Sequence, residues 1–130
     1  MNNYQFLKDY QDLQYLVMFD KIINLPFGSV SYCAGDESAF WNQALVNKEL
    51  NQEQLELIET TLKKLNRKPA VYFENRKSLE QLVEVLLKNN YRHYFEDCWL
   101  FHPGVEINKD RFGQVKKVLT ERVRYFSKNV

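Results

Sequence analysis

Glycine is scarce in this sequence, and its placement excludes one large class of ligand site. The four glycines are Gly28, Gly35, Gly104 and Gly113. A phosphate-binding loop needs several backbone N–H groups converging at a helix N-terminus, and glycine lets the backbone approach the anion closely. None of the four lies between an expected strand and a following core helix. The sequence therefore lacks the loop with which coenzyme-binding proteins cradle phosphate.

Cysteine and histidine are rare, with two of each. Cys98 and His102 lie four residues apart on an expected strand, which separates them by about 13 Å at about 3.3 Å per residue. One zinc ion, with bonds of about 2 Å, cannot join them. Cys33 and His93 could meet only through the tertiary fold, so we expect neither a metal site nor a Cys–His nucleophile. Both cysteines are interpreted as inert core residues.

No apolar run approaches the roughly 20 residues that a membrane helix needs. The first four residues, Met-Asn-Asn-Tyr, lack the basic start and apolar stretch of a signal peptide. Two isolated thiols in a domain of this size are typical of a reduced, intracellular protein. We therefore expect a cytoplasmic protein without a membrane partner.

Charge of one sign does not dominate, because 18 Lys/Arg against 17 Asp/Glu leave a formal net charge of +1. The basic residues gather late, and residues 106–130 hold seven Lys/Arg and three Asp/Glu. Basic residues interleaved with aromatics such as Phe112 and Tyr125 can contact nucleic acid. Such a run is more often a solvated helix face, so nucleic acid is kept only as an alternative partner.

What the sequence does have is apolar periodicity, and it predicts alternating helices and strands. Phe6, Tyr10, Leu13 and Val17 stripe one face of a first helix, which Pro26 and Gly28 would end. A β-hairpin over 29–33 and 39–46, a helix over 52–66 and a strand over 70–74 are then expected. A helix capped by Ser78, a strand over 91–102 and an amphipathic helix from Asn108 through Phe112, Val115, Leu119, Val123 and Phe126 follow.

This order, α-β-β-α-β-α-β-α, predicts an α/β protein built on a mixed sheet (α+β) with parallel crossovers. The best topological slot for an anion is the loop between the strand at 39–46 and the helix at 52–66. It consists of Asn47, Lys48, Glu49, Leu50 and Asn51. Lys48 could attract an anion, but the slot has no glycine and Glu49 adds a carboxylate, so an ordinary loop is favoured.

Several side chains could serve general acid–base chemistry: Glu74 at the end of an expected strand, and Tyr91, Tyr94, Glu96 and Asp97 on the expected strand 91–102. Strand ends in parallel sheets often line sites. Core tyrosines with hydrated hydroxyl groups, beside solvated carboxylates, are the favoured interpretation.

A series of features between Ser31 and His102 resembles one known family. They are Phe40-Trp41-Asn42 on a strand, a helix through Leu55 and Ile58, the strand Pro69–Phe73, a helix from Leu79 to Leu86 leading into Asn90-Tyr91, and Trp99. Together they resemble the GNAT superfamily of acyl-CoA-dependent N-acetyltransferases, and more narrowly the degenerate N-terminal half of tandem GNAT proteins.

The resemblance implies a GNAT-like (acyl-CoA N-acyltransferase) fold, but the family's functional residues are missing. Its pyrophosphate loop, Gln/Arg-x-x-Gly-x-Gly/Ala, would fall on the glycine-free slot at 47–51. Its general-acid tyrosine, five residues before the phenylalanine of a Gly-Phe pair, would fall on Leu86, with Asn90 and Tyr91 at the pair. The resemblance therefore implies a non-catalytic lobe that binds no cofactor alone, with acetyl-CoA as the cofactor if the chain is active or completed by a second domain.

The resemblance also implies a division of the chain and a partner. Residues 1–104 would form an incomplete GNAT-like N-terminal domain, and residues 105–130 an amphipathic basic helix that could open a second GNAT domain. The expected partner is such a domain in cis or in trans, or a second copy of the chain. A divergent active N-acetyltransferase, and a small nucleic-acid-binding protein that uses the basic C-terminal helix, are the alternatives.

Overall fold

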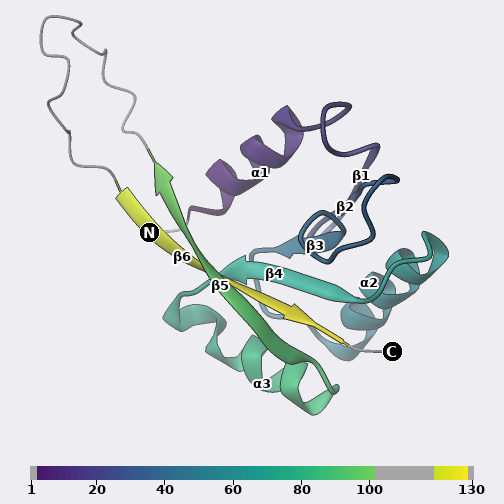
Figure 1. The fold of residues 1–130 in the computed structure, drawn as a ribbon. Coiled ribbons are helices and arrows are strands. Elements are labelled where there is room, and N and C mark those ends of the chain that lie inside the picture. The colour runs from purple at the N-terminus through teal and green to yellow at the C-terminus, as the bar shows by residue number, and fades with distance from the viewer. Residues whose placement is uncertain (1–2, 102–118, 129–130) are drawn as a thin grey trace, which may run out of the picture.

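The computed structural model describes residues 3–101 and 119–128, which form a mixed α+β fold around one six-stranded sheet (Figure 1). The strand order across the sheet is β1-β2-β3-β4-β6-β5. The helices are α1 (Tyr4–Leu13), α2 (Gln52–Lys64) and α3 (Glu80–Lys88), the last preceded by a 3₁₀ turn at Lys77–Leu79. The strands are β1 (Lys21–Leu25), β2 (Gly28–Tyr32), β3 (Gln43–Val46), β4 (Ala70–Glu74), β5 (Arg92–Phe101) and β6 (Leu119–Ser127).

The sheet contains one parallel pair of neighbours, β3 and β4, which α2 connects. The pairs β1–β2 and β2–β3 are antiparallel. The strand β6 is antiparallel to both β4 and β5 and lies between them. It follows that β4 and β5, joined through α3, run in the same direction without touching. The predicted parallel crossovers are therefore only partly right, since most neighbouring strands are antiparallel.

The two faces of the sheet bury different kinds of residue. One face carries an apolar core that α2 and α3 cover, with Phe73 and Phe126 from the sheet against Leu55, Ile58 and Leu82 from the helices. The other face lies under α1, as Figure 1 shows, and its smaller cluster contains Leu7, Leu45, Tyr72 and Tyr125. Successive strand residues point to opposite faces, so Tyr72 and Phe73 belong to different layers.

The predictions that rest on local signals are confirmed. The helix at 52–66 is α2, and Asn51 and Gln54 form the expected capping box. The strand at 70–74 is β4, and all five of its residues are buried. The helix that should end at Asn89-Asn90 does so, with Asn90 at a positive φ of 67°.

The first helix is shorter than predicted and its apolar stripe is not its buried face. It ends at Leu13, and Leu16 adopts a left-handed φ of 65° just beyond it. Leu7 and Gln11 face the sheet, whereas Leu13 and Val17 are about three-quarters exposed, at 75% and 74%. A 3.6-residue period identifies an apolar face but does not say what that face touches.

Other local predictions need correction. The strand β1 was missed, because Pro26 lies in the hairpin turn between β1 and β2 and Gly28 begins β2, so that neither residue ends a helix. The strand predicted over 39–46 begins only at Gln43, since residues 38–42 form a turn in which Asn42 N–H donates to the Ser38 carbonyl. Ser78 lies inside the 3₁₀ turn and does not cap α3.

The predicted C-terminal helix is wrong from Leu119 onward, where the chain forms β6. Leu119, Val123 and Phe126 satisfy helical spacing, but the segment is also rich in β-branched and aromatic residues. Pairing with β4 on one side and β5 on the other decides the outcome. Residues 119–127 thus belong to the same sheet as the other described strands, and the division of the chain at residue 104 stays a prediction. Residues 105–118 lie outside the described residues.

Candidate functional site

The predicted slot, Asn47–Asn51, follows the carboxyl end of β3 and leads into α2. Lys48 and Glu49 are exposed, whereas Leu50 is buried in the core. The strands β3 and β4 pair at two positions, Ala44 with Val71 and Leu45 with Tyr72. Beyond these pairs, β3 continues to Val46 and β4 to Glu74 without pairing to each other. The slot therefore stands where the two parallel strands stop pairing, which is the edge at which open sheets of this kind hold ligands.

The N-terminus of α2 is satisfied by its own side chains. The Asn51 Oδ1 atom accepts from Gln54 N–H at 2.8 Å, and Gln54 Oε1 accepts from Asn51 N–H at 3.0 Å. Glu53 adds a carboxylate in the first turn. An anion at this helix end would compete with the capping side chains and be repelled by Glu49 and Glu53. The capping side chains thus occupy the N–H groups of Asn51 and Gln54, two of the groups that an anion would use at this helix end.

Arg76 closes the gap between the two strand ends. It lies two residues after β4, and its Nη2 atom donates to the Asn47 carbonyl at the end of β3. The guanidinium thus links the ends of strands that no longer pair through their backbones. Sequence reasoning missed Arg76, because nothing in its neighbourhood indicates that it reaches back across 29 residues.

A layer of buried polar groups lies on the sheet face under α1. Glu74 is only 3% exposed, and its Oε2 atom accepts from Asn3 N–H at 3.1 Å. Asn3 is itself buried, and within the described ranges its side-chain oxygen has no hydrogen-bond partner. Ser29 Oγ donates to Gln11 Oε1 across the same layer. Burial raises the pKa of Tyr4, with a hydrogen bond to Ser29 acting in the opposite direction.

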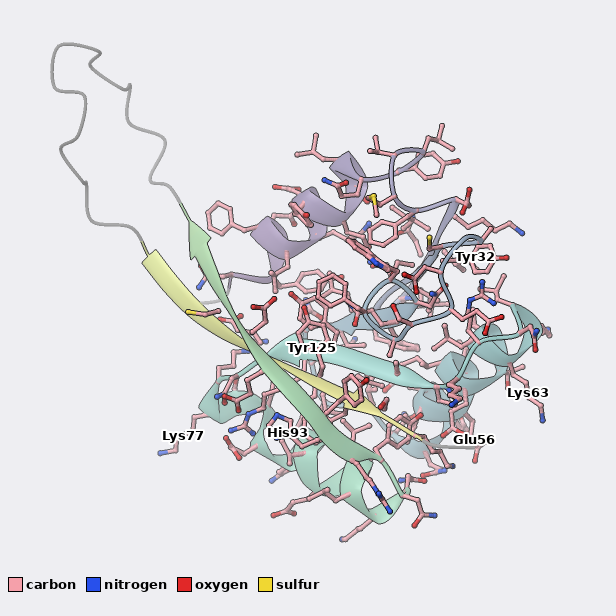
Figure 2. All side chains as sticks on the ribbon, in the orientation of Figure 1. Tyr32, Glu56, Lys63, Lys77, His93 and Tyr125 are labelled. Atoms are coloured by element: carbon pink, nitrogen blue, oxygen red, sulfur yellow. The ribbon has the colours of Figure 1, made fainter. Side chains whose placement is uncertain are left out.

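A row of aromatic rings continues this layer toward the turn before β3. Tyr72 and Tyr125 stack with ring centroids 4.2 Å apart, and Phe40 stacks on Tyr125 at 6.0 Å. Trp41 meets Phe40 edge to face at 4.7 Å. Figure 2 shows Tyr125 near the middle of the sheet, where β6 passes beside β4. Phe40, which carried part of the GNAT resemblance, thus packs on a strand, β6, that was expected to be helical.

The predicted acid–base residues are not brought together. Glu74 lies under α1, whereas Tyr91 is buried in the core on the other face. Tyr94 is 66% exposed, and Glu96 pairs with Arg124 at 3.4 Å and with His93 at 3.8 Å. Of the set, Glu74 alone combines burial with a place at the carboxyl end of a parallel strand.

Tyr91→Phe is expected to reduce the loss of stability at alkaline pH. Burial first, and then the nearby Glu59 carboxylate, raise the pKa of Tyr91. An unfolded tyrosine ionises near pH 10 while the folded one keeps its proton, so the unfolded state binds fewer protons above that pH. The free energy of unfolding therefore falls as the pH rises through about 10, by about 1.4 kcal/mol between pH 9 and 11 for one such group. Urea unfolding of the wild type and of Tyr91→Phe at pH 9 and pH 11 measures the two losses. An equal fall in the free energy of unfolding of both proteins would contradict the prediction.

A groove of about 990 Å³ lies at the C-terminal end of α2. Its lining includes Glu56, Glu59 and Lys63 of α2, Phe40 from the turn before β3, and Lys128 after β6. Glu56 and Lys63 lie on the side of the molecule away from Lys77 (Figure 2). Lys128 pairs with Glu59 at 3.7 Å, so charges of both signs meet in the groove. Its volume is within the range of small-molecule sites.

Arg67, which also lines this groove, uses its guanidinium for contacts within the chain. Its Nε atom donates to Asn42 Oδ1 at 3.1 Å, its Nη2 atom donates to the Cys33 carbonyl at 2.8 Å, and its guanidinium lies 5.0 Å from the Tyr32 ring centroid. Arg67 therefore fixes the turn between β2 and β3.

The two cysteines differ in burial. Cys33 is half-buried and Cys98 is exposed, so the prediction that both are core residues is wrong for Cys98. Among the described residues, no group of three or more His, Cys, Asp and Glu side chains could hold a metal ion.

Arg124 pairs with Glu80 as well as with Glu96, so this basic residue of β6 is engaged within the chain. In the part of the chain that the structure describes, no helix is both long and apolar enough to span a bilayer.

No family model, no curated protein and no solved structure matches the chain.

Proposed function

We propose that this chain is a GNAT-like module without catalytic activity of its own, which supports or pairs with an active acetyltransferase domain in cis or in trans. The resemblance of residues 31–102 motivates the proposal. One observation supports it most: groups of the chain itself already bind the backbone around the slot at 47–51, where the resemblance would place a diphosphate. Arg76 spans the strand ends, and the Asn51–Gln54 capping box satisfies the helix N-terminus.

The arrangement of the sheet is consistent with such a module. A parallel pair joined by a helix stops pairing beside the following loop, which is where an acyl-CoA would approach a GNAT-like sheet. This arrangement supports the proposal, because a degenerate GNAT module would keep the scaffold of its coenzyme site. Where a coenzyme-binding protein would have a flexible, glycine-containing bend, this chain has the carboxylates of Glu49 and Glu53. It also has the hydrogen bond from Arg76 to the Asn47 carbonyl.

Isothermal titration calorimetry with acetyl-CoA tests the proposal. We expect no saturable heat up to about 1 mM coenzyme, because binding at 1 μM would need about 8 kcal/mol of interaction that a filled slot does not offer. Inorganic pyrophosphate serves as a control for non-specific attraction to exposed lysines such as Lys48. A heat common to both ligands and removed by about 0.5 M salt reflects screening alone. Micromolar, salt-resistant binding of acetyl-CoA would overturn the proposal.

A second candidate is a divergent N-acetyltransferase that uses Glu74. The observation in its favour is a carboxylate buried on a sheet face rich in polar groups, beside the stacked Tyr72 and Tyr125. A buried carboxylate at a strand end can act as a general base if a substrate reaches it.

A thiol-release assay with acetyl-CoA and a pool of amines separates the two candidates. The non-catalytic module releases no more thiol than buffer, and Glu74→Gln makes no difference. Release that is lost in Glu74→Gln but retained in Glu84→Gln, an exchange on α3 (Glu80–Lys88), would favour the enzyme and contradict the first candidate.

A further inference from the structure

Exposed large apolar side chains are concentrated on α1 and the turn that follows it. Within the described ranges, eleven such side chains are exposed, and seven of them fall between residues 6 and 18. They are Phe6, Tyr10, Leu13, Tyr15, Leu16, Val17 and Met18, with exposed fractions from 37% to 75%. We call this set the α1 surface. Runs of consecutive exposed apolar residues, such as 15–18, are disfavoured in a soluble surface unless they serve a purpose.

The turn that carries half of this surface has a defined structure. Leu16 N–H donates to the Phe19 carbonyl at 2.8 Å, and Val17 and Met18 N–H both donate to the Gln14 carbonyl, at 3.0 and 2.9 Å. Leu16 holds a left-handed φ of 65°, which is unfavourable for a residue with a Cβ. The chain thus accepts backbone strain in order to hold apolar side chains in solvent, and such strain clusters at binding sites.

The surface approaches the size of one side of a specific interface. Its three aromatic side chains, at roughly 150–250 Å² each and about half exposed, present roughly 300 Å², and its four aliphatic side chains add roughly 200–300 Å². Two copies that meet through this surface would therefore bury about 1,000 Å² in total, which is the least that a specific interface needs.

The pattern on the helix favours a second copy as the occupant. Phe6, Tyr10 and Leu13 recur at steps of four and three, the spacing of a seam between two packed helices. A two-fold axis lets such a stripe pack against itself, because each residue meets a residue of the same kind. Lys8 pairs with Asp12 at 2.5 Å within α1, and the Asp9 carboxylate accepts from Gln5 Nε2 at 2.7 Å. One negative charge per copy is left on α1, which is too little to select a charged partner and is screened at ordinary salt.

We propose that the chain forms a two-fold homodimer through the α1 surface, with α1 of one copy packed against α1 of the other. The face of α1 that contacts the sheet, marked by Leu7 and Gln11, stays in place. The inference does not depend on the proposed function, because the α1 surface is separate from the slot at 47–51.

Light scattering coupled to size exclusion, over about 5–200 μM protein, tests the proposal. The wild-type chain should have twice the 15.6 kDa mass of the monomer. Leu13→Asp should raise the dissociation constant at least about 100-fold, since it puts a charge into the seam at its most exposed position. Leu87→Asp, at a leucine of α3 that is 54% exposed, is the matched control and should remain dimeric.

A second variant protects the test against misfolding. Leu16→Gly removes an apolar side chain and relieves the left-handed strain, so the monomer should keep or gain thermal stability while the dimer weakens. A monomeric wild-type chain at 200 μM would overturn the proposal, whatever other partner the surface then serves. The proposal would also be overturned if Leu87→Asp weakened the dimer as much as Leu13→Asp does. The same holds if both Leu13→Asp and Leu16→Gly left the dissociation constant of the dimer unchanged.

Discussion

A fragment that ends at residue 104 should be largely unfolded at 25 °C. Removing β6 strips β4 of its ladder from Ala70 to Glu74, and it leaves β5 without its neighbour in the sheet. It also removes Tyr125 and Phe126, which are 5% and 2% exposed and stack on Tyr72 and Phe73. Losing each buried aromatic costs about 3–5 kcal/mol, against a total stability of about 5–15 kcal/mol for a domain.

Circular dichroism and amide NMR of the fragment 1–104 measure this outcome. Because β6 comes from the end of the chain, the fragment also shows whether the first 104 residues form a unit. A matched fragment, 1–128, keeps every described strand and should melt like the full chain. A fragment 1–104 with dispersed amide signals and a cooperative transition would contradict the place of β6 between β4 and β5.

The second large effect is expected from Gly28→Ala, at the start of β2. A Cβ atom on Gly28 would lie 2.2 Å from the backbone oxygen of Leu45 and 3.1 Å from Val46 Cγ1. Gly28 pairs with Val46 in the ladder, so the neighbouring backbone cannot move without separating β2 from β3. We expect a loss of about 3 kcal/mol and a fall of roughly 10–15 °C in melting temperature.

Gly35→Ala is the control for Gly28→Ala, because nothing lies within 4 Å of a Cβ atom built on Gly35. This exposed substitution should change the free energy of unfolding by no more than about 0.5 kcal/mol. Urea denaturation of both variants gives the comparison. Equal stability of the two would mean that β2 and β3 are not packed as closely as the structure shows.

The sequence predicted elements whose signals lie within one segment. The capping box of Asn51 and Gln54, the apolar stripe of α2 and the continuous apolar run of β4 each contain all the information needed to recognise them. The same holds for the end of α3 at Asn90. In these cases propensity, capping and burial agree, and no distant part of the chain decides the outcome.

Prediction failed where long-range pairing chooses between two local possibilities. The segment at 119–127 fits a helical stripe and a strand equally well, and its two neighbours in the sheet decide the matter. The same limit applies to the candidate site. The spacing identified the slot at 47–51 as the place to look and showed that it lacks glycine, but the Arg76 contact with Asn47 depends on the fold. The buried layer around Glu74 likewise forms only when α1 covers the sheet.

The most direct test of the closed slot follows its own amide groups. In a ¹⁵N-labelled sample titrated with acetyl-CoA to about 1 mM, the amide signals of residues 47–51 should stay where they are. Saturating shifts of Lys48 and Leu50 with a micromolar dissociation constant would show that the coenzyme binds there, and would contradict a slot closed by Arg76 and the capping box.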